Sequence, residues 1–133
     1  MTQGGRFEFL HSGISVTDLR RSIDWYGRHF GFQVVREFEK EALEVKAAVL
    51  ELGGFTLEVL APFEPDVRKK TKGPLSHHLR STGTNHLALL ADDVADCFEQ
   101  FQQEGIEIVY PLLDGRIFFC KDPDGTLIEI KQK

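Results

Sequence analysis

The 133-residue chain is long enough for one domain with a proper hydrophobic core and too short for two ordinary domains. Hydrophobic residues make up 41% and charged residues 28%, the balance of a soluble globular protein. The net charge of −5 argues against a nucleic-acid binder, which usually has a basic face, and against attachment to an anionic membrane surface.

The sequence also bears on location. It has no apolar run of the roughly 18 residues that a transmembrane helix needs, and no apolar stretch follows a charged start in MTQGGRFEFL. Cys97 and Cys120 lie far apart and form no C-x-x-C motif, so free thiols in a reducing compartment are the economical interpretation. We therefore expect a cytoplasmic protein without a membrane span, whose two cysteines are small core residues.

A first module is predicted over residues 7–61. Alternation at 7–16 is typical of a strand. A helix is predicted from Asp18 to Phe30, since Leu19, Ile23, Tyr26 and Phe30 recur with the helical period. Thr17 or Asp18 can cap its start, and Gly31 can end it. Three more strands are predicted at 32–39, 43–52 and 54–61, the last two joined by a Gly53-Gly54 turn.

A linker and a second module follow. The linker covers residues 62–84, is rich in Pro and Gly, and has one expected helical turn near Leu75–Leu79. The second module covers 85–132, with a strand at 85–91 and a helix at 93–104. Its other strands are predicted at 106–112, 115–121 and 126–132, with a turn at Asp122-Pro123-Asp124-Gly125.

The two modules form an internal repeat. His11 matches His86, and Ile14 matches Leu89 at the same offset of 75 residues. G-F-T-L-E-V at 54–59 matches G-T-L-I-E-I at 125–130. Since neither module could bury both faces of its own sheet, we expect the sheets to pair. The predicted fold is α+β, with two βαβββ modules forming one curved, barrel-like mixed sheet and the helices outside.

Strand parity places a set of polar residues on one side of each module. Side chains alternate faces along a strand, so Glu58 lies opposite Leu57 and Val59, and Glu129 lies opposite its isoleucine neighbours. The strongly apolar face should meet a helix, which leaves the other face for four polar residues at repeat-equivalent places: His11, Glu58, His86 and Glu129.

Two imidazoles and two carboxylates suit a divalent ion such as Ni, Zn, Co, Mn or Fe(II). A single His or Glu in a strand is usually exposed or hydrogen-bonded, but two matching His and two matching Glu are hard to explain without a ligand. We therefore predict one metal ion held by these four residues. His77 and His78 lie in the linker, where we expect solvated surface.

The chain resembles the vicinal oxygen chelate superfamily, which includes glyoxalase I, methylmalonyl-CoA epimerase, extradiol dioxygenases and fosfomycin- and bleomycin-resistance proteins. The resemblance covers about residues 9–131. It rests on H-S-G-I-S-V-T-D-L-R-R-S-I-D-W-Y at 11–26, N-H-L-A-L at 85–89 and K-D-P-D-G-T-L-I-E-I at 121–130. It implies the same fold and the same four metal ligands.

The resemblance is closest to the glyoxalase I and epimerase branches. It implies a lyase or isomerase that moves a proton α to a carbonyl through a metal-stabilised enediolate or enolate, with Glu129 and Glu58 as catalytic base and acid. The substrate would be an α-carbonyl thiol adduct, as for lactoylglutathione lyase, or an acyl-CoA thioester. Ser15 and Pro62 stand where glyoxalase I typically has an Arg and an Asn that hold glutathione, whereas L-E-V-L-A-P at 57–62 resembles the epimerase.

Further residues could serve the substrate. Possible anion anchors are Arg36, Arg80, Arg116 and Lys121, for each of which an ordinary surface charge is the alternative. Possible apolar wall residues are Phe9, Leu60, Leu90 and Phe119, for which core packing is an equal alternative. The resemblance also implies a homodimer, and the sequence leaves open whether modules pair within one chain or between two.

Other functions remain open. His11, His86 and Glu129 alone would make the two-His-one-carboxylate triad of an Fe(II) dioxygenase. A fosfomycin-type resistance protein needs only three ligands. A metal-free small-molecule binding or drug-sequestering module is a further alternative, although such relatives usually lack the ligands that are all present here.

Overall fold

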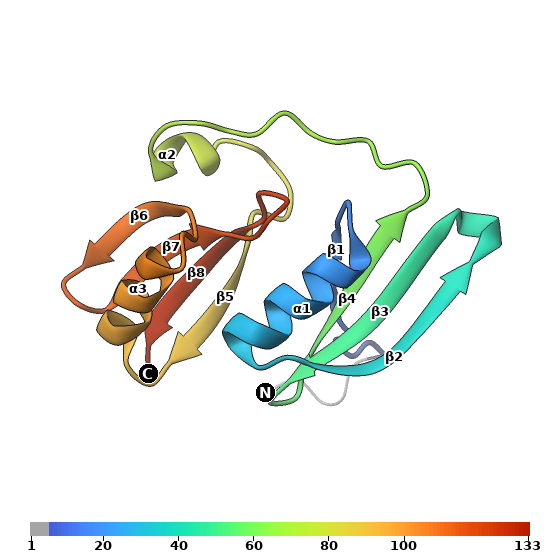
Figure 1. Ribbon diagram of the computed structural model, residues 1–133, viewed down its shortest axis with the longest axis horizontal. Coiled ribbons are helices and arrows are strands. Elements are labelled where there is room, and N and C mark those ends of the chain that lie inside the picture. The colour runs from blue at the N-terminus through green and yellow to red at the C-terminus, as the bar shows by residue number, and fades with distance from the viewer. Residues whose placement is uncertain (1–5) are drawn as a thin grey trace. The chain divides into compact units, whose positions relative to one another are not determined.

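The structure, a computed structural model, describes residues 6–133. The chain divides into two compact units, Met1–Val67 and Arg68–Lys133. Each unit contains one four-stranded mixed sheet and repeats the order strand, helix, three strands (Figure 1). The predicted α+β fold with two βαβββ modules is therefore confirmed, whereas the pairing of the two sheets into one curved surface stays a prediction.

The first unit contains one main helix and four strands. Its elements are β1 (Ser12–Ser15), α1 (Leu19–Phe30), β2 (Gln33–Lys40), the 3-10 turn η1 (Glu41–Leu43), β3 (Val45–Leu52) and β4 (Phe55–Pro62). The strand order is β1-β4-β3-β2, with β1 parallel to β4 and the other pairs antiparallel. Gly53 and Gly54 both have positive φ, as the predicted tight turn between β3 and β4 requires.

Local side chains set the ends of α1. The Asp18 carboxylate accepts a hydrogen bond of 3.0 Å from the Arg21 amide, so Asp18 rather than Thr17 is the N-cap. Gly31 ends the helix with φ of 83°, a conformation that glycine adopts without steric cost. The buried residues of the helix include Ile23 and Tyr26, which face the sheet.

β1 is shorter than predicted. The alternation at 7–16 suggested a strand from residue 7, but pairing with β4 begins at Ser12, opposite Leu57. β4 itself begins at Phe55, directly after the glycine turn, and Phe55 falls opposite Leu10 in this register, so residues before Leu10 have no strand beside them. Phe9 and Leu10 are each 77% exposed.

The second unit begins in the predicted linker. Its elements are α2 (Leu75–His78), β5 (His86–Ala91), α3 (Val94–Gln103), β6 (Ile108–Leu113), β7 (Ile117–Lys121) and β8 (Leu127–Gln132). The order is β5-β8-β7-β6, again with the first pair parallel and the others antiparallel. Asp93 caps α3 as Asp18 caps α1. No helix among residues 6–133 is long and apolar enough to span a membrane.

Each core lies between a helix and one face of its sheet. In the first unit Tyr26 of α1 packs with Leu50, Leu57 and Val59, all fully buried. The second core has the same plan, and its most deeply buried members are Val94, Phe118, Cys120, Ile128 and Ile130. The strand parity that was predicted from the sequence is thus confirmed: the apolar positions face the helix, and Glu58 and Glu129 face the other way.

Candidate metal centre

Register places the predicted ligands on the helix-free face of each sheet, here called the site face. Gly13 pairs with Glu58, and His11 lies two residues before Gly13, so both ligands of the first unit share this face. In the second unit Ala88 pairs with Glu129, and His86 lies two residues before Ala88. Each unit therefore brings one predicted His together with one predicted Glu.

The two pairs have similar exposure but different spacing. His11 Nε2 lies 3.4 Å from Glu58 Oε1, with side-chain exposures of 28% and 19%. His86 Nε2 lies 3.0 Å from Glu129 Oε1, with exposures of 29% and 18%. All four groups are half-buried and reachable from solvent, as the ligands of a catalytic metal must be.

These distances fit neighbouring ligands of one metal ion. A metal–ligand distance of about 2.1 Å, typical for imidazole nitrogen and carboxylate oxygen, puts two ligands about 3.0 Å apart at a right angle and about 3.4 Å apart at a tetrahedral angle. Neither unit, over residues 6–133, holds three or more His, Cys, Asp or Glu side chains that could bind a metal by themselves. Each unit thus places one predicted His beside one predicted Glu rather than a complete set of ligands.

The surroundings of His86 distinguish its two ring nitrogens. Its Nδ1 lies 2.9 Å from Asn85 Oδ1, and because an amide oxygen only accepts, Nδ1 must donate. The other ring nitrogen then faces Glu129 Oε1 at 3.0 Å. A lone pair and a carboxylate oxygen repel at this distance unless a proton or a metal ion lies between them.

Asn85 is a contact of the candidate site that the sequence analysis did not single out. It precedes His86 directly, and an amide beside a predicted metal ligand was the available signal, since metal-binding histidines usually donate their second ring N–H to a polar partner. The strand pattern could not reveal it, because Asn85 lies just before β5, which begins at His86.

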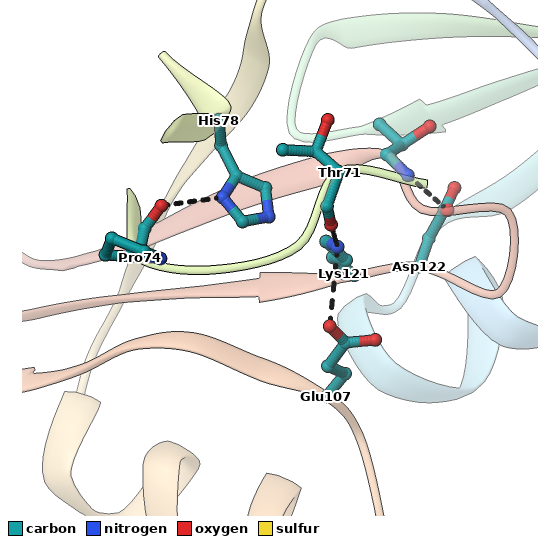
Figure 2. A network of polar contacts seen from close by, with 7 residues as sticks. Thr71, Pro74, His78, Glu107, Lys121 and Asp122 are labelled. Carbon is teal, nitrogen blue, oxygen red and sulfur yellow. Dashed lines mark hydrogen bonds and ion pairs between the residues drawn. The ribbon is translucent and has the colours of Figure 1, made fainter. Parts of the chain in front are cut away.

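Lys121 is not a free anion anchor or an ordinary surface charge. It is 6% exposed, its Nζ donates to the Thr71 carbonyl at 2.9 Å, and Glu107 Oε2 lies 3.4 Å away (Figure 2). The expectation for His78 was also wrong: it is 9% exposed, and its Nδ1 lies 3.0 Å from the Pro74 carbonyl (Figure 2). Lys121 of β7 therefore bonds to the segment before β5, whereas the His78 contact lies within that segment.

Arg36 differs from Lys121, because it is exposed and lies on the site face of the first unit. Glu58 pairs with Val49, and Val49 pairs with Arg36, so these three residues form one row across the sheet. The exposed guanidinium of Arg36 stacks 4.6 Å above the Phe38 ring, and Lys40 Nζ lies 5.8 Å from the same ring. With strands about 4.8 Å apart, Arg36 stands about 10 Å from Glu58 at the backbone.

The predicted wall residues divide into two kinds. Phe9 and Leu90 are 77% and 64% exposed, so neither is a core residue. Phe119 is buried on the site face, pairs with Glu129, and contacts the His86 ring edge-on with centroids 5.4 Å apart. Leu60 is half-buried on the same face as Glu58. Phe119 therefore supports the ligand pair directly.

The thiols are unsuited to nucleophilic chemistry. Burial is the main cause that raises the pKa of Cys120 to about 12, and burial together with nearby carboxylates raises the pKa of Cys97 to about 11. Both thiols stay protonated at neutral pH, and a protonated thiol is a poor nucleophile and metal ligand. Cys97 lies on α3 and Cys120 in β7, as predicted, but only Cys120 is a buried core residue, and Cys97 is half-buried.

The first unit also has an open depression of about 640 Å³, which lies away from His11 and Glu58. It is lined by residues at the start of α1 and the end of β4, among them Asp18, Arg20 and Pro62. Neither His11 nor Glu58 lines it, and Arg20 is paired with Glu37 at its edge. It therefore does not extend the metal site.

The two-module fold points to one class of protein, that of the βαβββ repeat folds. Residues 8–130 match the model of the Glyoxalase/Bleomycin resistance protein/Dioxygenase superfamily. The chain belongs to this superfamily.

Relatives within the superfamily include proteins named lactoylglutathione lyase or glyoxalase I. The chain is 29% identical to a lactoylglutathione lyase of Escherichia coli O157:H7 over 126 residues, which cover 91% of this chain and 89% of the relative. Glyoxalase I of Leishmania major, described as trypanothione-dependent, superposes with a TM-score of 0.77 at 25% identity, over 95% of this chain and 86% of the other. Glyoxalase I of Zea mays gives a TM-score of 0.70 at 26% identity, over 93% of this chain and 44% of that one.

Proposed function

We propose that the protein is a divalent-metal-dependent lyase of the glyoxalase I type, acting on an α-carbonyl thiol adduct. The observation that carries this proposal is the pair of His–Glu contacts, His11–Glu58 and His86–Glu129, at ligand-to-ligand distances of 3.4 and 3.0 Å. The resemblance of the whole chain to lactoylglutathione lyases supports the same reaction class. Together the pairs would supply the four ligands of one ion.

The chemistry follows from the donor set. When bound, a divalent ion polarises the substrate carbonyl and stabilises the negative charge that develops as the α-proton leaves. Glu129 is the proposed base that accepts this proton, and Glu58 is the proposed acid that returns a proton to the neighbouring carbon. Phe119, buried beside Glu129, keeps water from one side of that carboxylate.

Arg36 is the proposed anchor for the anionic end of the substrate. It lies in the Glu58 row, its side chain is exposed, and stacking on Phe38 restricts the guanidinium. A glutathione-type thiol carries carboxylates, which guanidinium groups bind through paired hydrogen bonds. This contact would replace those that Ser15 and Pro62 cannot make.

A second candidate is an epimerase that acts on an acyl-CoA thioester. Ser15 at the end of β1 and Pro62 at the end of β4 favour this candidate, because neither offers the Arg or Asn side chain of glyoxalase I. Proton transfer α to the thioester carbonyl would use the same two carboxylates. The dioxygenase alternative leaves Glu58 without a role although it lies beside His11.

The experiment that tests the proposal is metal analysis of the purified protein, joined to two activity assays. We expect about one Ni, Co, Zn or Mn ion per chain, and we expect His11→Ala to lose it. We also expect metal-dependent turnover of a methylglyoxal–glutathione adduct. Turnover of methylmalonyl-CoA instead would favour the epimerase. Bound iron with oxygen uptake would favour the dioxygenase, and no metal after reloading would leave a binding module.

Two further expectations belong to this proposal. Homodimerisation would allow the His–Glu pairs to meet between chains as well as within one, and measuring the mass of the metal-loaded protein in solution tests it. A cytoplasmic location agrees with two free cysteines among the described residues.

A further inference from the structure

The side chain of Asn85 connects the linker helix α2 to the ring of His86. Asn85 Nδ2 donates to the main-chain carbonyl of His78 at 2.9 Å, and Asn85 Oδ1 lies 2.9 Å from His86 Nδ1. The carbonyl can only accept, so the amide nitrogen must lie on that side and the amide oxygen on the side of the histidine. The orientation of the amide is therefore set by the main chain of α2.

This orientation fixes which nitrogen of His86 is free to bind a metal. Nδ1 donates to Asn85, so the lone pair of a neutral ring lies on Nε2, the atom that faces Glu129. Phe119 contacts the ring edge-on at an interplanar angle of 78° and limits its rotation. Turning the ring over would break the Asn85 bond and point a carbon atom at the carboxylate.

His78, the α2 residue in these contacts, is also buried. His78 is 9% exposed, and its own Nδ1 lies within hydrogen-bond distance of the Pro74 carbonyl at the start of α2 (Figure 2). The His78 carbonyl that receives Asn85 thus belongs to a turn that is itself held in place.

The first unit has no equivalent of this arrangement. Leu10 stands before His11, as Asn85 stands before His86, and the leucine side chain offers no hydrogen-bond acceptor. Leu10 is 77% exposed, and the His11–Glu58 distance is 3.4 Å compared with 3.0 Å in the second unit. The two units therefore match in their candidate ligands but differ in the residue that precedes the histidine and contacts its ring.

We propose that Asn85 is a positioning residue that holds His86 with Nε2 toward the metal, and that the His86–Glu129 pair is the preorganised half of the metal site. The inference rests on the metal dependence proposed above. A ligand whose orientation is fixed before binding loses less rotational freedom when the ion arrives, so the metal affinity depends on Asn85 although this residue does not touch the ion.

Three variants separate the two hydrogen bonds of Asn85. Asn85→Ala removes both bonds. Asn85→Asp keeps an oxygen that accepts from His86 Nδ1 but removes the donor to the His78 carbonyl. Thr84→Ala is the matched control, because Thr84 is the exposed neighbour and makes neither contact.

The measurement is Co²⁺ and Ni²⁺ affinity by competition with a chromophoric chelator, next to urea unfolding of the metal-free proteins. We expect Asn85→Ala to bind metal about 10- to 100-fold more weakly. Asn85→Asp should unfold more easily than the wild type but keep most of its metal affinity. In the NMR spectrum of the Co²⁺ protein, Asn85→Ala should lose one exchangeable, shifted ring N–H signal that Asn85→Asp retains.

Each outcome decides the matter. Unchanged metal affinity in Asn85→Ala, with the ring N–H signal intact, would overturn the inference while leaving the proposed function in place. Equal losses of affinity in Asn85→Ala and Asn85→Asp, in step with their stability, would reduce Asn85 to a structural role and overturn it as well. A wild-type protein that binds neither ion would refute the metal-dependent function and, with it, the inference.

Discussion

Asp122 closes the hairpin that carries Glu129, and its removal should cost a measurable part of the stability. Its Oδ1 accepts hydrogen bonds from the amides of Asp124 at 2.9 Å and Thr126 at 2.8 Å, and the residue is 5% exposed. The Asp122 amide in turn donates to the Thr126 carbonyl. Asp122→Ala therefore leaves two half-buried amides of the β7–β8 turn without their acceptor.

The magnitude follows from these contacts. A hydrogen bond to a charged group contributes about 1.5–3 kcal/mol, and two bonds that share one oxygen contribute less than twice that amount. We expect Asp122→Ala to lower the free energy of unfolding by about 2–4 kcal/mol, which corresponds to roughly 10 °C in Tm for a domain of this size. Asp122→Asn, which keeps an acceptor without the charge, should lose about half as much.

Urea unfolding followed by circular dichroism, in the presence of a chelator, measures both variants. Asp66→Ala is the control, because Asp66 is exposed and a surface substitution should change stability by less than about 0.5 kcal/mol. If Asp122→Ala is as stable as this control, the turn does not depend on the carboxylate and the reasoning is wrong.

Three further predictions concern the site and the thiols. Glu129→Gln should abolish turnover while Glu99→Gln, on the exposed side of α3, stays active; full activity of Glu129→Gln would exclude it as the base. Arg36→Gln should raise KM about tenfold with kcat nearly unchanged, as loss of one charged contact predicts; an unchanged KM would remove Arg36 from substrate binding. Burial raises the pKa of Cys120 from 9.0 to about 12, so the thiol ionises at lower pH in the unfolded chain than in the folded one. The stability that depends on the protonated Cys120 thiol is therefore complete below pH 9.0 and is lost as pH rises toward 12. Urea midpoints measured across that range, in wild type and Cys120→Ala, check the sign, and a midpoint that rises with pH only in the wild type contradicts it.

Much of the fold was predictable because its signals are local. Helical periodicity gave α1 and α3, paired glycines gave the β3–β4 turn, and Asp18 was one of the two residues predicted to cap α1. The repeat then assigned equivalent places to the four polar residues, and strand parity put them on the helix-free faces. These inferences needed only spacing, since a strand alternates and a helix turns with fixed periods.

What failed depended on the register between strands or on segments far apart in the chain. β1 starts five residues later than predicted, at Ser12 instead of residue 7, and its partner β4 begins opposite Leu10, so no earlier residue can pair with it. Lys121 looked like a surface charge, yet the Thr71 carbonyl, 50 residues earlier, receives its ammonium group. His78 looked like a solvated linker residue and is buried.

By itself, the sequence determined the two βαβββ modules, the faces of their strands and the identity of the four candidate ligands, because these follow from short-range periodicity and from a repeat that can be seen in the letters. Only the tertiary structure decided that His86 and Glu129 lie closer together than His11 and Glu58, and that Asn85 supports one pair alone. The reason is physical: periodicity fixes the direction of a side chain, whereas its distance to a partner depends on strand register and on the packing of segments that are remote in sequence.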